Sequence, residues 1–442
     1  MDSTHPRNGS RRRRRTDRPA RPDDASPHAY GRDFWLAYAA NTLLMTAVSL
    51  LFRYSDFIEV LGGTELQLGW IVGIGAVGSL GMRLFQGMGI DRLGPRLIWL
   101  VSLLAVAAAL AAHLAISRVD TPAVYLVRVL YHTALAGAFG ASITAISIRA
   151  PAARMAEVIG MLGSSGFVGM ILGSQLGDVL CRQTPLERWH LDRLFIAAAL
   201  LVLASLACAH LATRHDRRPL KRKHIPMTTL VRRYHPGSLL VMAVVMGMGL
   251  GLPNTFLRPF TQALGISQIA LFFTAYSITA FVTRIAARRV PDRLGIRPTV
   301  LLGMSVLAIS MLLYLTVDSL WALILPGVVS GIAHALLFPS VVAGASRAFP
   351  HRYRGLGTTL VLGMFDLGNL IGMPLAGTLV FASKSAGLPP YPTMFVTFAT
   401  IIIAASSYYA LASRKKASPV ERAEAARESS ADATPTELVG KA

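Results

Sequence analysis

Ionisable side chains inside long apolar segments are the residues of this sequence that could do chemistry. Asp366 is a carboxylate about ten residues from either end of its apolar segment, and Arg128 lies within another. A charged group in hydrocarbon is costly, so each is a functional candidate by default. Burial disfavours an ionised carboxylate and a nearby arginine favours it. Asp366 could therefore be protonated in one state of the protein and paired in another.

The partner of Asp366 cannot be chosen from the sequence. The candidate partners are Arg128, Arg258 and Arg284, which all lie in or at the ends of apolar segments. A structural alternative is a permanent ion pair, or a hydrogen bond to a neighbouring helix. For Arg128 as well, a structural ion pair stands beside a functional role.

Two arginines occupy similar contexts at the ends of two segments. Arg53 follows Leu-Phe and Arg258 follows Phe-Leu. Equivalent arginines from two halves of a protein could converge on one anion, because the planar guanidinium matches a carboxylate or phosphate. In the alternative reading both side chains snorkel to the outer head groups. Asp56 and Glu59 lie close enough to Arg53 in the chain to pair with it.

Neutral polar residues within the segments complete the candidate set. His132 and His334 could couple to protons, since imidazole titrates near neutral pH. A buried histidine is more often a hydrogen-bonded packing residue. Asn254 stands beside Pro253 in a segment and could contact a solute.

The elements that must position these groups are twelve apolar segments. The sequence is 53% hydrophobic and only 15% charged, which excludes an ordinary soluble domain. About 20 residues suffice for a helix to cross about 30 Å of hydrocarbon. We expect membrane-spanning helices near 34–53, 66–90, 97–117, 121–145, 157–181, 193–213, 238–260, 267–289, 298–317, 319–344, 356–381 and 391–412.

The basic residues predict the orientation of these spans. Residues 1–33 hold nine arginines and the 214–237 linker holds eight Lys or Arg. Lys and Arg accumulate on the cytoplasmic side. We therefore expect a multi-pass protein of the plasma (cell inner) membrane with both termini in the cytoplasm. Few basic residues fall in the opposite loops: Arg118, Arg182, Arg188, Arg193 and Lys384.

The domain plan follows from the same pattern. We expect a disordered basic tail over 1–33, a six-helix bundle over 34–213, a basic linker over 214–237, a second six-helix bundle over 238–412 and a tail over 413–442. The net charge of +21 is explained by loops and tails, which favour anionic lipid head groups over nucleic acid as partners.

A short motif occurs once in each half, 201 residues apart. In the first half it comprises Arg83, Gly87, Asp91, Arg92, Gly94 and Arg96, and the second copy retains Arg284, Asp292, Arg293, Gly295 and Arg297. A second correspondence relates 151–173 to 350–372 with an offset of 199. Paired halves are a common plan of secondary transporters. Small residues four apart allow close helix packing, so we expect Gly169, Gly173, Gly368 and Gly372 to pack the two bundles together.

The pattern Gly-x-x-x-Asp-Arg-x-Gly-x-Arg from Gly87 to Arg96 resembles the loop motif of the major facilitator superfamily, although Pro95 departs from it. The resemblance covers roughly residues 34–412. It implies an all-α membrane protein of twelve transmembrane helices in two pseudo-symmetric bundles, with spans one, four, seven and ten around a central cavity. Arg128 matches the arginine that the family usually carries on the fourth span.

The resemblance also implies an inner gate. The loop aspartate holds the two halves closed in the superfamily, so we expect Asp91 near the start of the eleventh span and Asp292 near Glu157. Arg83 and Arg284 lie about 12 Å from the inner ends of their helices, where we expect them to brace this gate.

Other chemistries find no support in the sequence. The two cysteines predict neither a disulfide framework nor a metal site, and no phosphate-binding loop or metalloprotease motif occurs. We expect no enzyme, cofactor or metal, and a monomer whose partners are a small solute, protons and membrane lipids.

These observations together predict secondary transport. The first expectation is proton-coupled movement of an anionic or zwitterionic organic solute across the plasma membrane, in export rather than uptake. Facilitated uptake is an alternative. A transport-dead membrane sensor or assembly partner is the alternative from another class.

Overall fold

The computed structural model describes residues 30–151, 154–183, 185–214, 227–350 and 353–413, and these are helical with connecting turns. Eleven helical segments in this part are long and apolar enough to cross a membrane, and α10 is a shorter apolar helix. A helix stands at each of the twelve predicted positions. The all-α membrane fold class is thus confirmed, with α10 only 17 residues long.

The first bundle holds six membrane helices. They are α1 (Arg32–Leu50) continued by η1 (Leu51–Arg53) and α2 (Tyr54–Val60), α3 (Glu65–Leu93), α4 (Pro95–Ala112) continued by η2 (His113–Ala115), α5 (Pro122–Arg149), α6 (Met155–Leu180) and α7 (Arg188–Thr213).

The second bundle follows the short helix α8 (Met227–Tyr234). It holds α9 (Leu239–Ala263), α10 (Ala270–Ala286) with α11 (Val290–Leu294), α12 (Ile296–Leu313) continued by η4 (Tyr314–Thr316), η5 (Trp321–Leu323) leading into α13 (Ile324–Arg347), α14 (Arg354–Ser385) and α15 (Pro390–Ala412).

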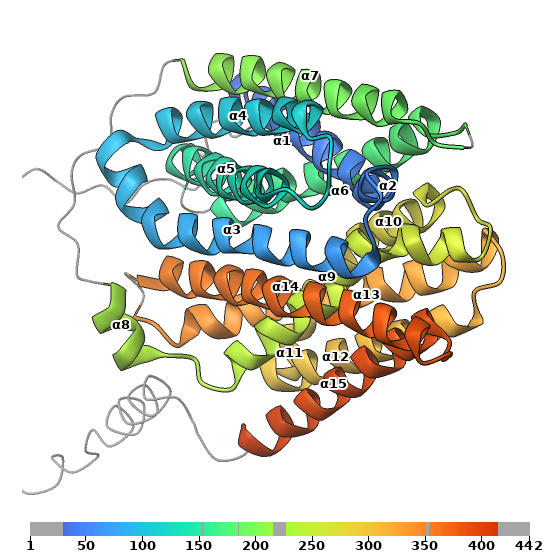
Figure 1. Ribbon diagram of the computed structural model, residues 1–442. Coiled ribbons are helices and arrows are strands. Elements are labelled where there is room, and N and C mark those ends of the chain that lie inside the picture. Colours follow the sequence, from blue (N-terminus) through green and yellow to red (C-terminus); the bar gives the residue numbers. More distant parts are fainter. Residues whose placement is uncertain (1–29, 152–153, 184, 215–226, 351–352, 414–442) are drawn as a thin grey trace, which may run out of the picture.

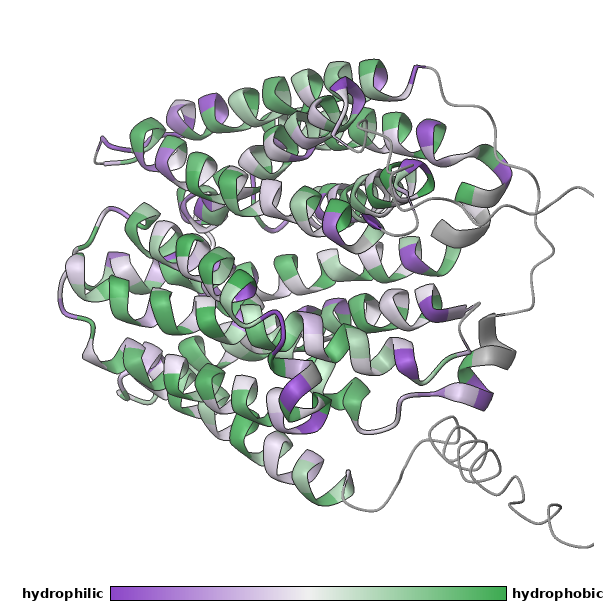
Figure 2. Cartoon of the chain, turned by 180° about the vertical axis from the view of Figure 1, so that it is seen from behind, coloured by the Kyte–Doolittle hydropathy of each residue, from purple (hydrophilic) through white to green (hydrophobic). Residues whose placement is uncertain are grey.

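The two bundles lie one above the other, with α3 and α14 side by side at the boundary (Figure 1). The helix pair α6 and α10 makes a second contact across it. The end of the molecule at which α1 begins and α15 ends, beside α8, is called the terminal end here, and the other the distal end. Hydrophobic residues cover the helices, and hydrophilic ones gather at their ends (Figure 2).

Close packing at the boundary depends on glycines that the sequence reading did not single out. A Cβ on Gly69 would collide with the carbonyl oxygen of Met373, and one on Gly73 would meet the ring of Pro374 at 2.5 Å. These contacts let α3 approach α14 closely.

The prediction that Gly169, Gly173, Gly368 and Gly372 pack the two bundles together is wrong. A Cβ on Gly169 would lie 2.6 Å from the carbonyl of Thr42 on α1, and one on Gly173 would collide with the carbonyl of Thr46. Gly368 and Gly372 face α9 in the same way. Each set packs helices within its own bundle, because α6 has α1 beside it and α14 has α9 beside it.

Candidate functional site

A buried charge cluster at the distal end joins the two halves. Arg53 Nε donates to one oxygen of Asp56 and Arg258 Nε donates to the other, both at 2.8 Å. The exposed fractions of these residues are 1% for Arg53, 0% for Asp56 and 3% for Arg258. The two arginines therefore converge on a carboxylate of the protein, Asp56. The role expected of them in binding an anionic substrate stays a prediction. Neither side chain reaches the head groups, so the snorkelling alternative is wrong.

A second carboxylate and a loop complete this distal cluster. Arg53 Nη1 donates to Asp178 Oδ1 at 2.7 Å, and Asp178 Oδ2 accepts from the backbone N–H groups of Ile269 and Ala270 at the start of α10. The start of a helix favours a carboxylate. Arg53 and Arg258 also both donate to the carbonyl of Ser267. Two arginines are thus balanced by two aspartates.

Further polar contacts cross the boundary on the distal rim. Gln262 donates to both oxygens of Glu59 at 2.9 Å. Glu65 at the start of α3 accepts from Lys384 and from Tyr391. The distal cluster and these rim contacts close the distal end of the molecule.

Asp366 pairs with Arg83, and all three predicted partners are wrong. Arg83 Nε on α3 donates to Asp366 Oδ2 on α14, and the exposed fractions of the two side chains are 16% and 12%. Arg128 and Arg284 lie on α5 and α10, whereas α14 packs along α3 and α9. Arg258 is on α9, but it pairs with Asp56 in the distal cluster. The pair bridges the two bundles, which is the kind of contact expected if Arg83 braces the inner gate.

Arg284, the counterpart of Arg83 in the repeat, has a different partner. Its guanidinium lies 5.1 Å from the ring centroid of Phe167 on α6, and its Nε is buried without a hydrogen-bond partner. The 199-residue offset relates Phe167 to Asp366. The repeat therefore places an ion pair in one interface and a cation–π contact in the other.

Arg128 on α5 is a buried cation without a carboxylate partner among the described residues. It is 6% exposed, and its guanidinium lies 4.2 Å from the ring centroid of Tyr54 and 5.2 Å from that of Tyr131. Its Nε and Nη1 are buried without hydrogen-bond partners. The rings offset part of the cost of burial, and the positive charge remains uncompensated.

The two candidate histidines, His132 on α5 and His334 on α13, have different neighbours. A Cβ on Gly75 would lie 2.8 Å from Arg128 Cγ and 3.0 Å from His132 Cδ2, so the glycine makes room for both side chains. The equivalent of Gly75 is Tyr276, whose hydroxyl lies 2.5 Å from His334 Nδ1. His132 Nε2 is buried without a partner. Asn254 is partly buried in α9 beside Pro253.

The loop motif has a clear backbone role. Gly94 and Gly295 both have φ of 86° between two helices, a conformation that favours glycine. Arg96 donates to the carbonyl of Arg214, and Arg297 donates to that of Ala410, so each closes the end of a neighbouring helix.

The structure describes only part of the predicted inner gate. Arg92 and Arg293 are exposed. The surroundings of Gly87 and the side chains of Asp91 and Asp292 lie outside what the structure describes, so the contacts expected of the two aspartates remain predictions.

Sequence reasoning missed the aromatic partners and the shared carboxylate. Phe167 could have been found, because the 199-residue offset aligns it with Asp366. Asp56 was considered as a partner of Arg53 alone. No pattern in the sequence pointed to Tyr54 or Tyr131. The described residues contain no group of three or more metal-ligating side chains.

Comparisons with known proteins give a consistent result. The sequence profile of the Major Facilitator Superfamily matches residues 34–266 and 239–440. An uncharacterized MFS-type transporter, YhhS of Escherichia coli O6:H1, is 26% identical over 279 residues, which cover 62% of this chain and 63% of the relative. The match thus spans under two thirds of that relative's length.

Solved structures resemble the fold. The nucleoside transporter NupG superposes with a TM-score of 0.68 at 16% identity, covering 87% of this chain and 99% of that one. The human organic anion transporter MFSD10 gives 0.63 at 16% identity, with 86% and 99% covered. A D-xylose-proton symporter gives 0.66 at 15% identity, with 84% and 96% covered.

Proposed function

The chain belongs to the Major Facilitator Superfamily, and on that premise we propose that it is a secondary active transporter of a small organic anion. It works by alternating access, in which the two bundles rock around a site between them. The distal cluster and the Arg83–Asp366 pair are the contacts that such a motion must break and remake. The direction proposed is export, driven by protons.

One observation carries the anionic substrate: the uncompensated charge of Arg128. The distal cluster is neutral, since Arg53 and Arg258 face Asp56 and Asp178. Arg83 is neutralised by Asp366. Arg128 has only rings beside it among the described residues. A buried cation without a counter-ion is costly, and a bound anion would offset that cost.

Proton coupling is proposed at Asp366. Protonation of this carboxylate would release Arg83, since the ion pair needs the charged form of both groups. The pair joins α3 to α14, so breaking it removes one contact between the two bundles. A proton bound at Asp366 would thereby loosen one interface contact, which is the link that a coupled carrier needs.

The proposed location is the plasma membrane with the terminal end in the cytoplasm. Arginines at the terminal end support it; examples are Arg149, Arg154, Arg288, Arg289, Arg347 and Arg354. We propose that the protein acts as a monomer, since one chain supplies both bundles.

A flux assay tests the proposal. Purified protein in liposomes is given an imposed pH gradient and three analogues of one shape, namely benzoate, benzamide and benzamidine, which are anionic, neutral and cationic. We expect concentrative transport of benzoate that ends when the gradient is dissipated. Equilibration without accumulation would indicate facilitated uptake, and the absence of flux would favour a sensor.

Two variants of one residue sharpen the assay. Arg128→Gln should reduce benzoate transport at least about tenfold, the effect of losing about 1.4 kcal/mol of binding. Arg128→Lys keeps the charge but loses the planar guanidinium, so its transport should be intermediate. Benzamidine transported as well as benzoate, or full activity in Arg128→Gln, would contradict the anion site.

A further inference from the structure

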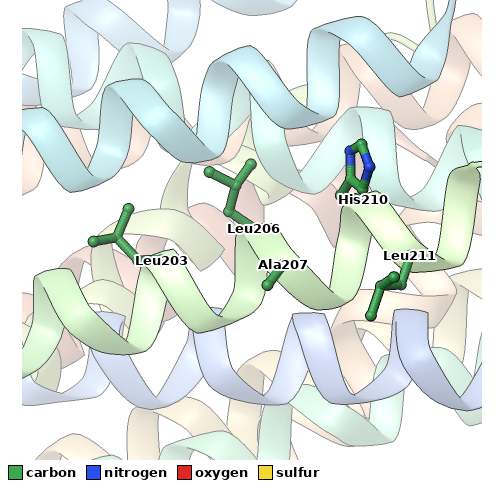
Figure 3. A pocket seen from close by; sticks show the side chains of 5 residues that line it. All are labelled: Leu203, Leu206, Ala207, His210 and Leu211. Atoms are coloured by element: carbon green, nitrogen blue, oxygen red, sulfur yellow. The ribbon is translucent and has the colours of Figure 1, made fainter.

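A groove on the outer face of α7 has no role in the proposed transport cycle. It is a shallow, open hollow of about 490 Å³, lined by residues of α7 alone: Leu203, Leu206, Ala207, His210 and Leu211. Figure 3 shows these side chains along one helix, with neighbouring helices on either side. Aliphatic side chains that face outward from a membrane helix contact lipid chains.

The groove ends at a positively charged patch. Arg214 lies one helical turn beyond His210, so the two side chains share a face of α7. Arg96 donates to the carbonyl of Arg214 at 3.3 Å, and Arg149 donates to that of Ala212 at 2.7 Å. The last turn of α7 thus gathers three guanidinium groups.

The charge of this patch is only partly balanced. One acidic residue stands beside it among the described residues, since Asp33 lies 3.7 Å from Arg149 and is itself about half exposed. Arg96 and Arg214 have no carboxylate partner among the described residues, so these two arginines leave the patch positive. An anion is therefore the complementary ligand for this end of the groove.

His210 is the unusual member of the lining. It is an exposed polar side chain on the outer face of a membrane-spanning helix, and a polar group in that position is costly without a partner. Its position three residues before the end of α7 places it close to the level of lipid head groups. A phosphate or glycerol oxygen would give the imidazole a hydrogen bond.

The second bundle supplies a comparison within the same chain. Arg297 donates to the carbonyl of Ala410 near the end of α15, as Arg96 does at the end of α7. Leu411, which is 67% exposed, stands near the end of α15, 201 residues after His210. The arginine that closes the helix is thus common to both halves, whereas the histidine belongs to one.

We propose that this groove binds an anionic diacyl phospholipid from the leaflet at the terminal end. One acyl chain would lie along Leu203, Leu206 and Ala207, and the phosphate would sit between His210 and Arg214. The distance from Leu203 to Arg214 along the helix is about 16 Å, close to half of the roughly 30 Å hydrocarbon thickness. The stretch from the groove to Arg214 therefore matches one leaflet in length, and its positive charge is opposite to that of an anionic head group.

Native mass spectrometry of the full-length purified protein tests the site. Phosphatidylglycerol and phosphatidylcholine with identical acyl chains are added in equal amounts. We expect preferential retention of phosphatidylglycerol, reduced about fivefold by Arg214→Gln if one arginine contributes its usual share near a charged head group. His210→Leu should reduce the preference for phosphatidylglycerol, and Ala207→Trp should reduce retention of both lipids by filling the groove.

Arg297→Gln is the control from the other bundle, because it removes the counterpart of Arg96, which binds the end of α15 rather than the end of α7. It should leave the lipid preference unchanged. Equal retention of the two lipids by the wild type, or unchanged retention in both Ala207→Trp and Arg214→Gln, would overturn the proposal. A dimer that Ala207→Trp dissociates would assign the groove to a second copy of the chain instead.

Discussion

Arg83 and Arg284 occupy equivalent positions in the two halves and meet different partners. Arg83 on α3 pairs with the carboxylate of Asp366 on α14, whereas Arg284 on α10 lies against the ring of Phe167 on α6. Both contacts cross the boundary between the bundles. The two halves therefore place an arginine in the same way at two interfaces. The first interface contains a neutral ion pair, whereas the second contains an arginine with its positive charge unpaired by a carboxylate.

This difference separates two roles that a buried arginine can take. An ion pair is neutral and sensitive to protonation of the carboxylate. A cation–π contact holds the guanidinium and leaves its charge available. The first interface is thus suited to coupling and the second to attracting an anion, together with Arg128.

The largest effect is expected at Asp56, where a carboxylate binds two arginines at once. Asp56→Asn leaves two buried cations short of a counter-ion, which should cost about 3 to 5 kcal/mol of unfolding free energy. Denaturant unfolding in detergent measures it. Glu59→Gln on the exposed rim is the control and should cost at most about 1 kcal/mol. Similar losses in both would show that burial of the distal cluster does not matter.

Asp366→Asn breaks the ion-pair side of the comparison. We expect about 3 kcal/mol of destabilisation, near the low end for a buried pair because both side chains are slightly exposed. Substrate exchange should survive while accumulation driven by the pH gradient is lost. Asp366→Glu keeps a titratable group and should retain some accumulation. Wild-type accumulation in the asparagine variant would end the coupling hypothesis, and loss of folded protein would favour a structural pair.

Phe167→Asp would make the two interfaces alike. The new carboxylate would neutralise Arg284, so transport of benzoate should fall about tenfold, equivalent to about 1.4 kcal/mol. Phe167→Asn removes the ring without adding charge and serves as the control. If the two variants transport equally, the charge of Arg284 plays no part in attracting the anion.

Phe167→Leu should give the smallest effect. Losing a cation–π contact at a partly desolvated site costs about 1 kcal/mol, and coupling to the pH gradient should be unchanged. Phe338→Leu, which removes a ring that packs against His334 and makes no cation–π contact with Arg284, is the matched control. A loss of accumulation in Phe167→Leu would mean that both interfaces take part in coupling.

The sequence alone predicted the helices and the repeat. The span positions follow from hydropathy, and the equivalence of Arg83 with Arg284 follows from a fixed spacing. It also identified Asp366 and Arg128 as charges inside spans. These properties are local, because each depends on residues within one helix or on one offset along the chain.

Only the tertiary structure decided which charges meet. Asp366 lies 283 residues from Arg83, and Asp56 lies 202 residues from Arg258. Gly69 and Gly73 let α3 approach α14, and that approach makes Arg83 the partner of Asp366 rather than Arg128, Arg258 or Arg284. Pairing between spans depends on helix rotation and separation, which close side-chain packing sets and hydrophobic periodicity does not specify.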